Sequence, residues 1–248
     1  MCSPKSWRRP LYSRVSKWIG VNVDEFESSL PSDVTPRGTF EDYKTPNAFF
    51  TRELKKSARP IIRSKKLLLS PVDGTVSVYE ENLPTSESIQ LHQVKGVRYD
   101  LNEFVGEHVH IDSKNNLYSV VLYLSPANYH RIHAPADVSV SNRVHVPGQL
   151  LPVKAYYANK VKGLFTLNER VVLNGSWDEG FFSMGLVGAF NVGSIRLENE
   201  SDRIVTNQPN ELLYKNYKHR KQYERAWAVP QGEQLGRFEV VAVATCEA

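Results

Sequence analysis

The feature that most limits the fold is the pattern downstream of residue 67, where apolar and β-branched runs are short and are separated by Gly, Pro, Asn and Asp. Runs of this kind predict strands, and their close spacing leaves little room for the crossover helices of a βαβ sheet. We therefore expect a β-rich, sandwich- or barrel-like core. The predicted strands are residues 67–71, 75–79, 117–124, 138–146, 170–173, 181–187, 191–197 and 240–244.

The connections of this core are less regular. Residues 154–165 leave a helix and an ordered loop equally open. Residues 199–223 are polar, charged and irregular, which predicts a surface excursion without regular structure.

The first 23 residues carry Lys and Arg but no Asp or Glu. After Pro10, the apolar residues Leu11, Val15, Trp18 and Ile19 recur at helical spacing, which predicts an amphipathic helix. Two interpretations stay open: the helix lies on an anionic membrane surface, or it packs its apolar stripe on the protein core. A degraded targeting peptide is a third interpretation.

Residues 24–60 continue as short helices and loops, with a helix expected within residues 45–55. Together the patterns predict an α+β protein, with amphipathic N-terminal helices on a β-rich catalytic core. We expect a basic, helical, membrane-facing segment at residues 1–60 and the core at residues 61–248.

Composition and charge exclude several classes of protein. The 31 Lys and Arg residues face 27 Asp and Glu residues, which is not the dense basic surface of a nucleic-acid-binding protein. Cys2 and Cys246 stand far apart, so we expect a reducing compartment and no disulfide framework. No run approaches the ~18 apolar residues that a membrane-spanning helix needs, and we expect no secretory signal peptide.

Two histidines, His130 and His133, follow the strand predicted at 117–124, in a turn bounded by Pro126 and Pro135. A turn at a strand end can hold polar side chains toward a cavity, and histidine is the side chain best suited to carry protons near neutral pH. The two are therefore a candidate acid–base pair. The residues alone equally allow ordinary surface or capping roles. No further ligands stand at the spacing that zinc requires, so we expect no metal site.

Asp73 lies in the sequence Ser70-Pro-Val-Asp-Gly74, where Asp-Gly after an apolar run most often marks a turn. It gains a catalytic interpretation if its carboxylate meets a histidine. A buried carboxylate behind an imidazole fixes the tautomer and supports the charged form of the ring.

These segments, in this order, resemble the phosphatidylserine decarboxylase proenzyme family. Each piece is short, but the ordered set is highly specific and runs over almost the whole chain. The N-terminal Arg9-Pro-Leu-Tyr and Gly20-Val-Asn-Val are more similar to the mitochondrial, animal-type branch than to the bacterial one. The matching pieces are Phe49-Phe-Thr-Arg-Glu-Leu-Lys55, Arg59-Pro60, Ser70-Pro-Val-Asp-Gly74, Val94-Lys-Gly96, residues 123–135, Pro147-Gly148, Leu164-Phe165, Asn168-Glu-Arg170, residues 187–195, Gly232-Glu233 and Leu235-Gly-Arg-Phe238.

The resemblance implies a carboxy-lyase that converts phosphatidylserine to phosphatidylethanolamine and carbon dioxide. In this family a serine in a Leu-Gly-Ser-Thr motif cleaves the chain after the preceding glycine and becomes a covalent pyruvoyl (pyruvate) cofactor, which acts as an electron sink. By resemblance, Asp73 and His133 are the orienter and the base of self-cleavage. His130 is the residue that assists decarboxylation or reprotonation.

The resemblance also implies partners and a location. The expected partners are phosphatidylserine itself and an anionic membrane surface, with a homodimer left open and no nucleic acid. The expected location is the mitochondrial inner membrane, as a peripheral protein.

The sequence departs from the family pattern after Glu239. Aligned on Gly236-Arg-Phe238, Ala242 stands where the serine is expected, and Val241 replaces the glycine. Alanine carries no nucleophile, so we expect that this chain neither cleaves itself nor forms the pyruvoyl group. The short C-terminal chain and the last strands of the family are expected to be missing, as in an isoform or an erroneous gene model. The alternative function is a catalytically inactive lipid-binding or regulatory pseudoenzyme.

Overall fold

The computed structural model describes residues 4–26, 40–82, 89–94, 97–109, 111, 115–199, 204–207 and 218–240. Its helices are α1 (Lys5–Ile19), α2 (Pro46–Phe50), α3 (Leu101–Val105), α4 (Ala155–Ala158) and α5 (Leu164–Leu167), with 3-10 turns at Val23–Glu25 and Phe40–Asp42. Its strands are β1 (Thr75–Asn82), β2 (Gln90–Val94), β3 (Val97–Asp100), β4 (Leu117–Tyr123), β5 (Arg131–His133), β6 (Val138–Val146), β7 (Arg170–Trp177), β8 (Gly180–Val187), β9 (Val192–Leu197), β10 (His219–Val229) and β11 (Gln234–Val240).

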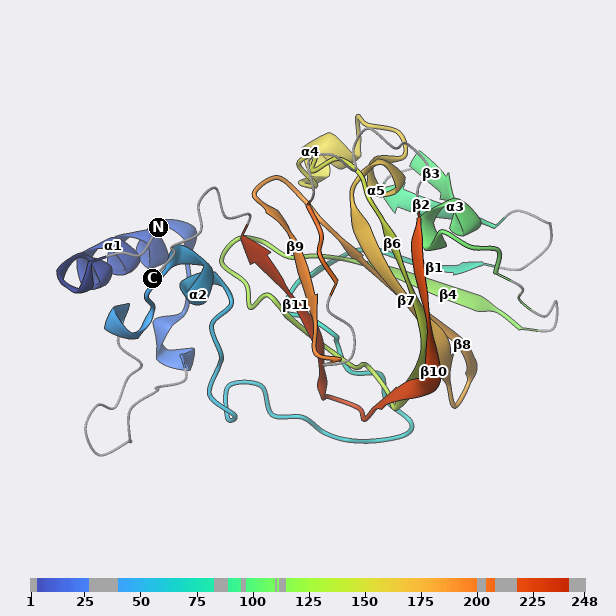
Figure 1. The fold of residues 1–248 in the computed structure, drawn as a ribbon, viewed down its shortest axis with the longest axis horizontal. Coiled ribbons are helices and arrows are strands. Elements are labelled where there is room, and N and C mark those ends of the chain that lie inside the picture. Colours follow the sequence, from blue (N-terminus) through green and yellow to red (C-terminus); the bar gives the residue numbers. More distant parts are fainter. Residues whose placement is uncertain are drawn as a thin grey trace.

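The strands form a four-stranded sheet of order β10-β6-β7-β8, a three-stranded sheet of order β5-β11-β9, and the two-stranded ribbons β1-β4 and β2-β3 (Figure 1). The pairs in these sheets are antiparallel. The prediction of a β-rich α+β fold without βαβ units is therefore confirmed.

The main core lies between the three-stranded and the four-stranded sheet. Ile132 on β5, Ile195 on β9 and Leu235 on β11 are buried in one cluster with Val140 on β6 and Leu173 on β7. Apolar side chains that alternate along facing strands fill the space between two sheets in this way.

The central strand β7 is buried on both of its faces. Val171 and Leu173 point into the main core, whereas Val172 joins a second cluster with α3, α5 and the β2-β3 ribbon. Successive side chains of a strand point to opposite faces of the sheet, so a strand that is buried on both faces has a continuous apolar sequence. This explains why the sequence Arg170-Val-Val-Leu173 shows no alternation.

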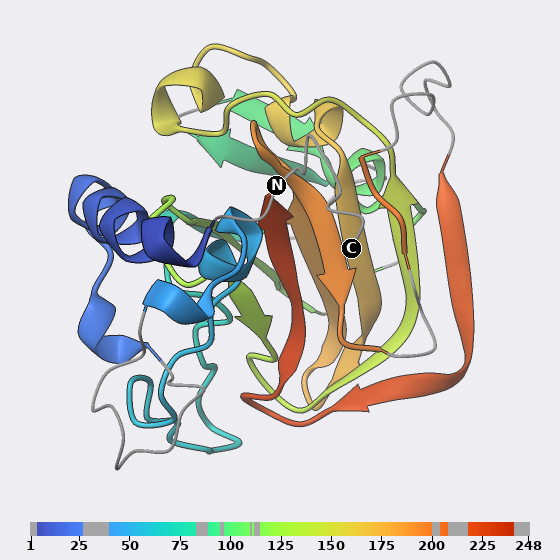
Figure 2. The same ribbon diagram turned by 60° about the vertical axis from the view of Figure 1, so that its left-hand side comes forward.

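The N-terminal helices lie beside the sheets and form a separate aromatic cluster (Figures 1 and 2). The Tyr12 ring of α1 stacks on the Phe49 ring of α2 with centroids 4.9 Å apart. Phe49 also makes an edge contact with Phe26. Ala127 packs against the same cluster, so these helices contact the turn that carries the two histidines.

The apolar stripe predicted for α1 is divided between two faces. Val15 and Ile19 pack on the aromatic cluster together with the buried Tyr12. Trp18 is 86% exposed, and Leu11 is 42% exposed. The two interpretations left open by the sequence are thus both compatible with one helix, because its inner face packs on the protein and its outer face remains apolar.

Several predicted elements need correction. Residues 67–71, predicted as a strand, form none, although the carbonyl oxygen of Pro71 accepts a hydrogen bond from the amide of His133 on β5. The helix expected within 45–55 is limited to α2, which begins after its Thr45 cap and ends before Thr51. Residues 154–165 contain the short helix α4, and α5 begins at Leu164. The excursion predicted at 199–223 is interrupted by β10, which begins at His219.

Of the last predicted strand, 240–244, only residue 240 is described, as the last residue of β11, which runs from Gln234 to Val240. Residues 241–244 lie outside the described residues, so this part of the prediction stays a prediction. Among the helices of the described part of the chain, none has the length and apolar character needed to cross a bilayer.

Candidate active site

The turn between Pro126 and Pro135 is held by contacts from Arg52 and from β11. Arg52, which is 5% exposed, donates through Nη2 to the carbonyl oxygens of Ala127 at 2.7 Å and Asn128 at 3.2 Å. The other end of the turn is β5, which pairs with β11. A buried guanidinium that bonds to carbonyl oxygens fixes the path of a loop that has no regular partners of its own.

His130 is buried in this turn and is 4% exposed. Its ring stacks on the Phe50 ring with centroids 3.9 Å apart. Its Nε2 lies 3.1 Å from the carbonyl oxygen of Ser125 and therefore carries the proton, while Nδ1 is buried and has no hydrogen-bond partner among the described residues. Burial, and secondarily the positive charge of Arg52, lower the pKa of His130 to about 4. The ring is therefore neutral at physiological pH.

His133 is oriented through both ring nitrogens. Nδ1 lies 2.9 Å from the carbonyl oxygen of Gly232 and donates a hydrogen bond to it. Nε2 lies 3.1 Å from the hydroxyl of Tyr129, so it accepts from that hydroxyl. The two rings are also stacked, with centroids 5.7 Å apart. One tautomer is thus selected, and the lone pair of Nε2 faces a hydroxyl group.

Asp73 and His133 are close along the backbone but are not bonded through their side chains. The amide of His133 donates to the carbonyl oxygen of Pro71 at 2.8 Å, which brings the Ser70–Gly74 turn beside β5. The carboxylate of Asp73 instead forms a 2.6 Å ion pair with Arg59, which also pairs with Glu25 at 3.0 Å. The structure therefore gives Asp73 a guanidinium partner where the sequence suggested an imidazole.

Tyr129 is the hydroxyl partner of His133. Burial is the main cause that raises the pKa of Tyr129; the charge of Arg131 acts in the opposite direction, and the charges of Glu53 and Asp73 act in the same direction as burial. A raised pKa keeps the phenol protonated, so it remains a donor toward Nε2 of His133.

The two histidines lie at different positions along β11. The amide of Phe238 donates to the carbonyl oxygen of His130 at 3.0 Å, two residues before the end of the strand. His133 is paired with Gln234 at the start of the strand. At about 3.3 Å per residue, His133 lies roughly 20 Å along β11 from Val240. The end of the strand, after which Ala242 follows, is therefore nearer to His130. Ala242 itself lies outside the described residues.

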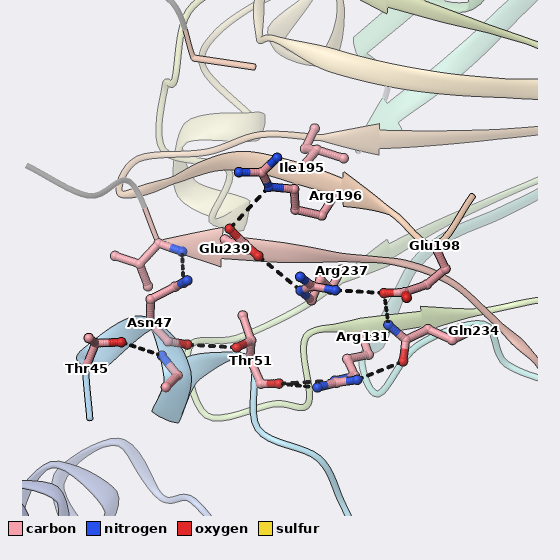
Figure 3. Close-up of polar contacts among 12 residues, drawn as sticks. Thr45, Asn47, Thr51, Arg131, Ile195, Arg196, Glu198, Gln234, Arg237 and Glu239 are labelled. Carbon is pink, nitrogen blue, oxygen red and sulfur yellow. Dashed lines mark hydrogen bonds and ion pairs between the residues drawn. The ribbon is translucent and has the colours of Figure 1, made fainter. Parts of the chain in front are cut away.

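The end of β11 is hydrogen-bonded to α2 (Figure 3). The amide of Val240 donates to Oδ1 of Asn47 at 2.9 Å. Thr51, next to α2, accepts through its carbonyl oxygen from the guanidinium of Arg131 at 3.0 and 3.1 Å. Arg131 also donates to Gln234 on β11 at 3.0 Å. Helix α2, β5 and β11 are thus joined by polar bonds around His130.

A second polar cluster is buried away from these histidines. His145 on β6 and Glu169 are 2% and 3% exposed, and their Nε2 and Oε1 atoms are 2.8 Å apart. Oε1 of Glu169 also accepts from the amide of Asn207 at 2.7 Å. Arg170 donates to the carbonyl oxygens of Phe104, Thr166, Asn168 and Glu103, so this guanidinium ties β7 to α3 and α5.

Sequence reasoning missed the residues that position the histidines. Tyr129 and Gly232 lie within pieces that match the family. Neither a tyrosine beside a histidine nor a glycine before a glutamate indicates that the residue orients a histidine ring. Arg52 and Arg59 belong to the N-terminal segment, and their partners lie 14 to 76 residues away. Both arginines belong to pieces that match the family, but no local pattern in the sequence indicates their partners.

A hollow of about 280 Å³ lies apart from the two histidines. Its lining includes residues 63–65 and 67, Trp177 and Gln231. Neither His130 nor His133 lines it. Within the described ranges, no three His, Cys, Asp or Glu side chains form a group that could hold a metal ion.

Comparison with known proteins identifies the family. The model of the phosphatidylserine decarboxylase family, described as "Phosphatidylserine decarboxylase", matches residues 46–241. This chain belongs to the phosphatidylserine decarboxylase family. The prediction made from the ordered motifs is confirmed, and the matched range contains Asp73, His130 and His133.

The relatives carry the same family name. The chain is 34% identical over 262 residues to the mitochondrial phosphatidylserine decarboxylase proenzyme of Cricetulus griseus, with 94% of this chain and 59% of the relative aligned. The Caenorhabditis elegans protein of that name is 46% identical over 163 residues, with 65% and 41% aligned. The proenzyme 1 of Saccharomyces cerevisiae is 27% identical over 321 residues, with 94% and 62% aligned. The chain therefore spans about three fifths of the length of the mammalian relatives it matches.

Proposed function

We propose that this chain derives from a decarboxylase that converts phosphatidylserine to phosphatidylethanolamine and carbon dioxide. The observation that carries the proposal is the family match over residues 46–241, which includes the whole arrangement around the two histidines. We assign Asp73 and His133 to the self-cleavage step and His130 to decarboxylation or reprotonation. The oriented tautomer of His133 and the neutral state of His130 support acid–base roles.

The residues after β11 do not fit the pyruvoyl group of the family. A pyruvoyl group is made from a serine that follows a glycine, and this chain has Val241 and Ala242 at those positions. The methyl group of alanine has no lone pair with which to attack a carbonyl carbon. We therefore propose that this chain does not mature by itself.

The proposed partner is an anionic membrane surface, and α1 supports it. Trp7, Leu11 and Trp18 are exposed by 69%, 42% and 86% and lie on one face, because their spacing of four and seven residues closes full helical turns. Arg14 is exposed between them and Lys17 lies beside them. An exposed face of tryptophan, leucine and cations suits the interface of an anionic bilayer. We propose a peripheral location at the mitochondrial inner membrane. We also propose that the chain can form a homodimer.

The activity is tested by restoring the missing end. Residues 240–248 are replaced by the corresponding C-terminal segment of the Caenorhabditis elegans relative, and the product is followed by intact mass and by formation of phosphatidylethanolamine. We expect the chimera to cleave itself and to decarboxylate phosphatidylserine, and the original chain to do neither. A folded chimera that cleaves but forms no phosphatidylethanolamine would contradict the proposed substrate.

The same chimera carries two matched controls. His133→Asn removes the proposed base of self-cleavage and is expected to leave the chain intact. His130→Asn is expected to leave cleavage largely unchanged and to reduce decarboxylation. If both variants block cleavage equally, the division of roles between the two histidines is wrong.

The alternative function is a lipid-binding or regulatory pseudoenzyme, which Ala242 and the exposed face of α1 both favour. Co-sedimentation of the original chain with vesicles distinguishes it. Binding to vesicles that contain phosphatidylserine, without cleavage or turnover, supports the alternative. Failure to bind anionic vesicles contradicts it.

A further inference from the structure

Residues 60–69 present a surface that the site described above does not explain. The connection from α2 to β1 exposes Ile61, Ile62, Leu67 and Leu68 by 46%, 72%, 53% and 63%. Four large apolar side chains so close together in water are unfavourable unless another surface covers them. The segment also contains Arg63, Lys65 and Lys66, and it has no acidic residue.

The backbone of this segment is held by one buried side chain. Gln231 is 6% exposed and donates through Nε2 to the carbonyl oxygens of Leu67, Ser64 and Pro135 at 2.7, 3.3 and 3.2 Å. Its Oε1 accepts from the amide of Ser64 at 2.9 Å. The outward direction of the apolar side chains is therefore set by the fold.

The cations of the segment are available to an external anion. Arg63 pairs with Glu233 at 3.0 Å and Lys65 with Asp178 at 3.5 Å, but both pairs lie in the open, with all four side chains more than half exposed. Exposed pairs of this kind contribute little and exchange readily for other anions. An apolar protein partner would cover the isoleucines and leucines but leave the cations unmatched. An anionic bilayer matches both, because apolar side chains enter the acyl boundary while cations bind phosphates.

The segment lies directly beside the residues that orient His133. Arg59, just before it, forms the ion pair with Asp73. The side chain of Ile61 packs on Gly232, where an added Cβ would lie 2.8 Å from Cδ1 of Ile61. The carbonyl oxygen of Gly232 is the partner of Nδ1 of His133. Figure 2 shows the segment on the same side of the sheets as α1, below that helix.

We propose that residues 60–69 form a second membrane-contact segment, besides α1, which docks the His133 end of the site on an anionic bilayer. Ile62 and Leu68 enter the interface, and Arg63, Lys65 and Lys66 bind lipid phosphates. The segment thereby holds the His133 end of the site at the bilayer surface. The inference deepens the proposed function, because it rests on a membrane lipid as substrate.

The test compares single substitutions that introduce a negative charge into the full chain. Ile62→Glu and Leu68→Glu place an anion in the proposed interface. Val205→Glu is the matched control, because Val205 is 61% exposed on a different segment. Binding is measured by co-sedimentation with vesicles of phosphatidylcholine alone, with phosphatidylserine, and with phosphatidylglycerol. Circular dichroism and urea unfolding verify that each variant is folded.

We expect Ile62→Glu and Leu68→Glu each to lower the partition coefficient on both anionic vesicles by about tenfold or more, because burial of such a side chain contributes at least that factor. Val205→Glu is expected to change it by less than about twofold, because it lies on a different segment, outside the proposed interface. Wild-type binding by both variants, or an equal loss in all three proteins, overturns the proposal.

Failure of this inference is separable from failure of the proposed function. Turnover of detergent-solubilised phosphatidylserine by the chimera depends on the site but not on docking to a bilayer. Ile62→Glu in the chimera is expected to retain that turnover and to lose turnover on vesicles. Equal turnover of the variant and its parent on vesicles counts against the membrane segment alone.

Discussion

The burial of His130 predicts a loss of stability in acid that can be assigned to a single ring. The pKa of His130 is about 4 in the folded chain, against 6.5 as its ordinary value. Because the folded pKa is the lower one, the unfolded chain takes up the proton first as the pH falls. Stability is therefore fully present above about pH 6.5 and is lost progressively toward pH 4.

The size of the effect follows from the two pKa values. One unit corresponds to about 1.4 kcal/mol, so the difference amounts to about 3 kcal/mol once both states are protonated. At about pH 5, where the unfolded state is almost fully protonated and the folded state is not, the loss is about 2 kcal/mol. This is a substantial share of the ~5–15 kcal/mol that stabilises a typical domain.

The assay is urea unfolding of the original chain and of His130→Phe at about pH 7.5 and about pH 5. Phenylalanine preserves an aromatic contact with Phe50 but does not titrate. The other histidines are present in both proteins, so their contributions cancel in the difference. We expect the original chain to lose about 2 kcal/mol more than the variant between these pH values. A difference below about 0.5 kcal/mol would refute the assignment of the low pKa to the buried ring of His130.

Three further predictions concern single polar groups. Arg170→Met is expected to lower the free energy of unfolding by about 3 kcal/mol or more, measured by urea unfolding, because four carbonyl partners lose a buried donor; a loss below ~1 kcal/mol would contradict this. Tyr129→Phe removes the donor to Nε2 of His133, and we expect ¹⁵N NMR of the histidine ring to show a mixture of tautomers or protonation states, whereas an unchanged spectrum would mean that Gly232 alone fixes the ring. Arg59→Gln is expected to lower stability by less than about 1 kcal/mol, since its ion pair with Asp73 is partly exposed, and a loss of several kcal/mol would show that this pair organises the turn.

The sequence predicted those strands whose side chains alternate between apolar and polar over consecutive residues. The strand predicted at 138–146 coincides with β6, because its side chains alternate between core and surface. β5 has three residues, too few to show any period, and it exists because β11 and the backbone at Pro71 supply its hydrogen bonds. β10 was missed because its first residues are charged and lie at the edge of a sheet, where water can solvate them.

The family and the β-rich class could be inferred from the sequence alone, and Asp73, His130 and His133 were selected from it as candidates, because motifs and strand periods lie in consecutive residues. The sequence also shows that Ala242 carries no nucleophile. The state of each group depends on the tertiary structure. His130 is neutral because Phe50, eighty residues earlier in the chain, covers its ring. Asp73 faces Arg59, and Tyr129 and Gly232 orient His133, because pKa values and tautomers depend on neighbours that folding brings together.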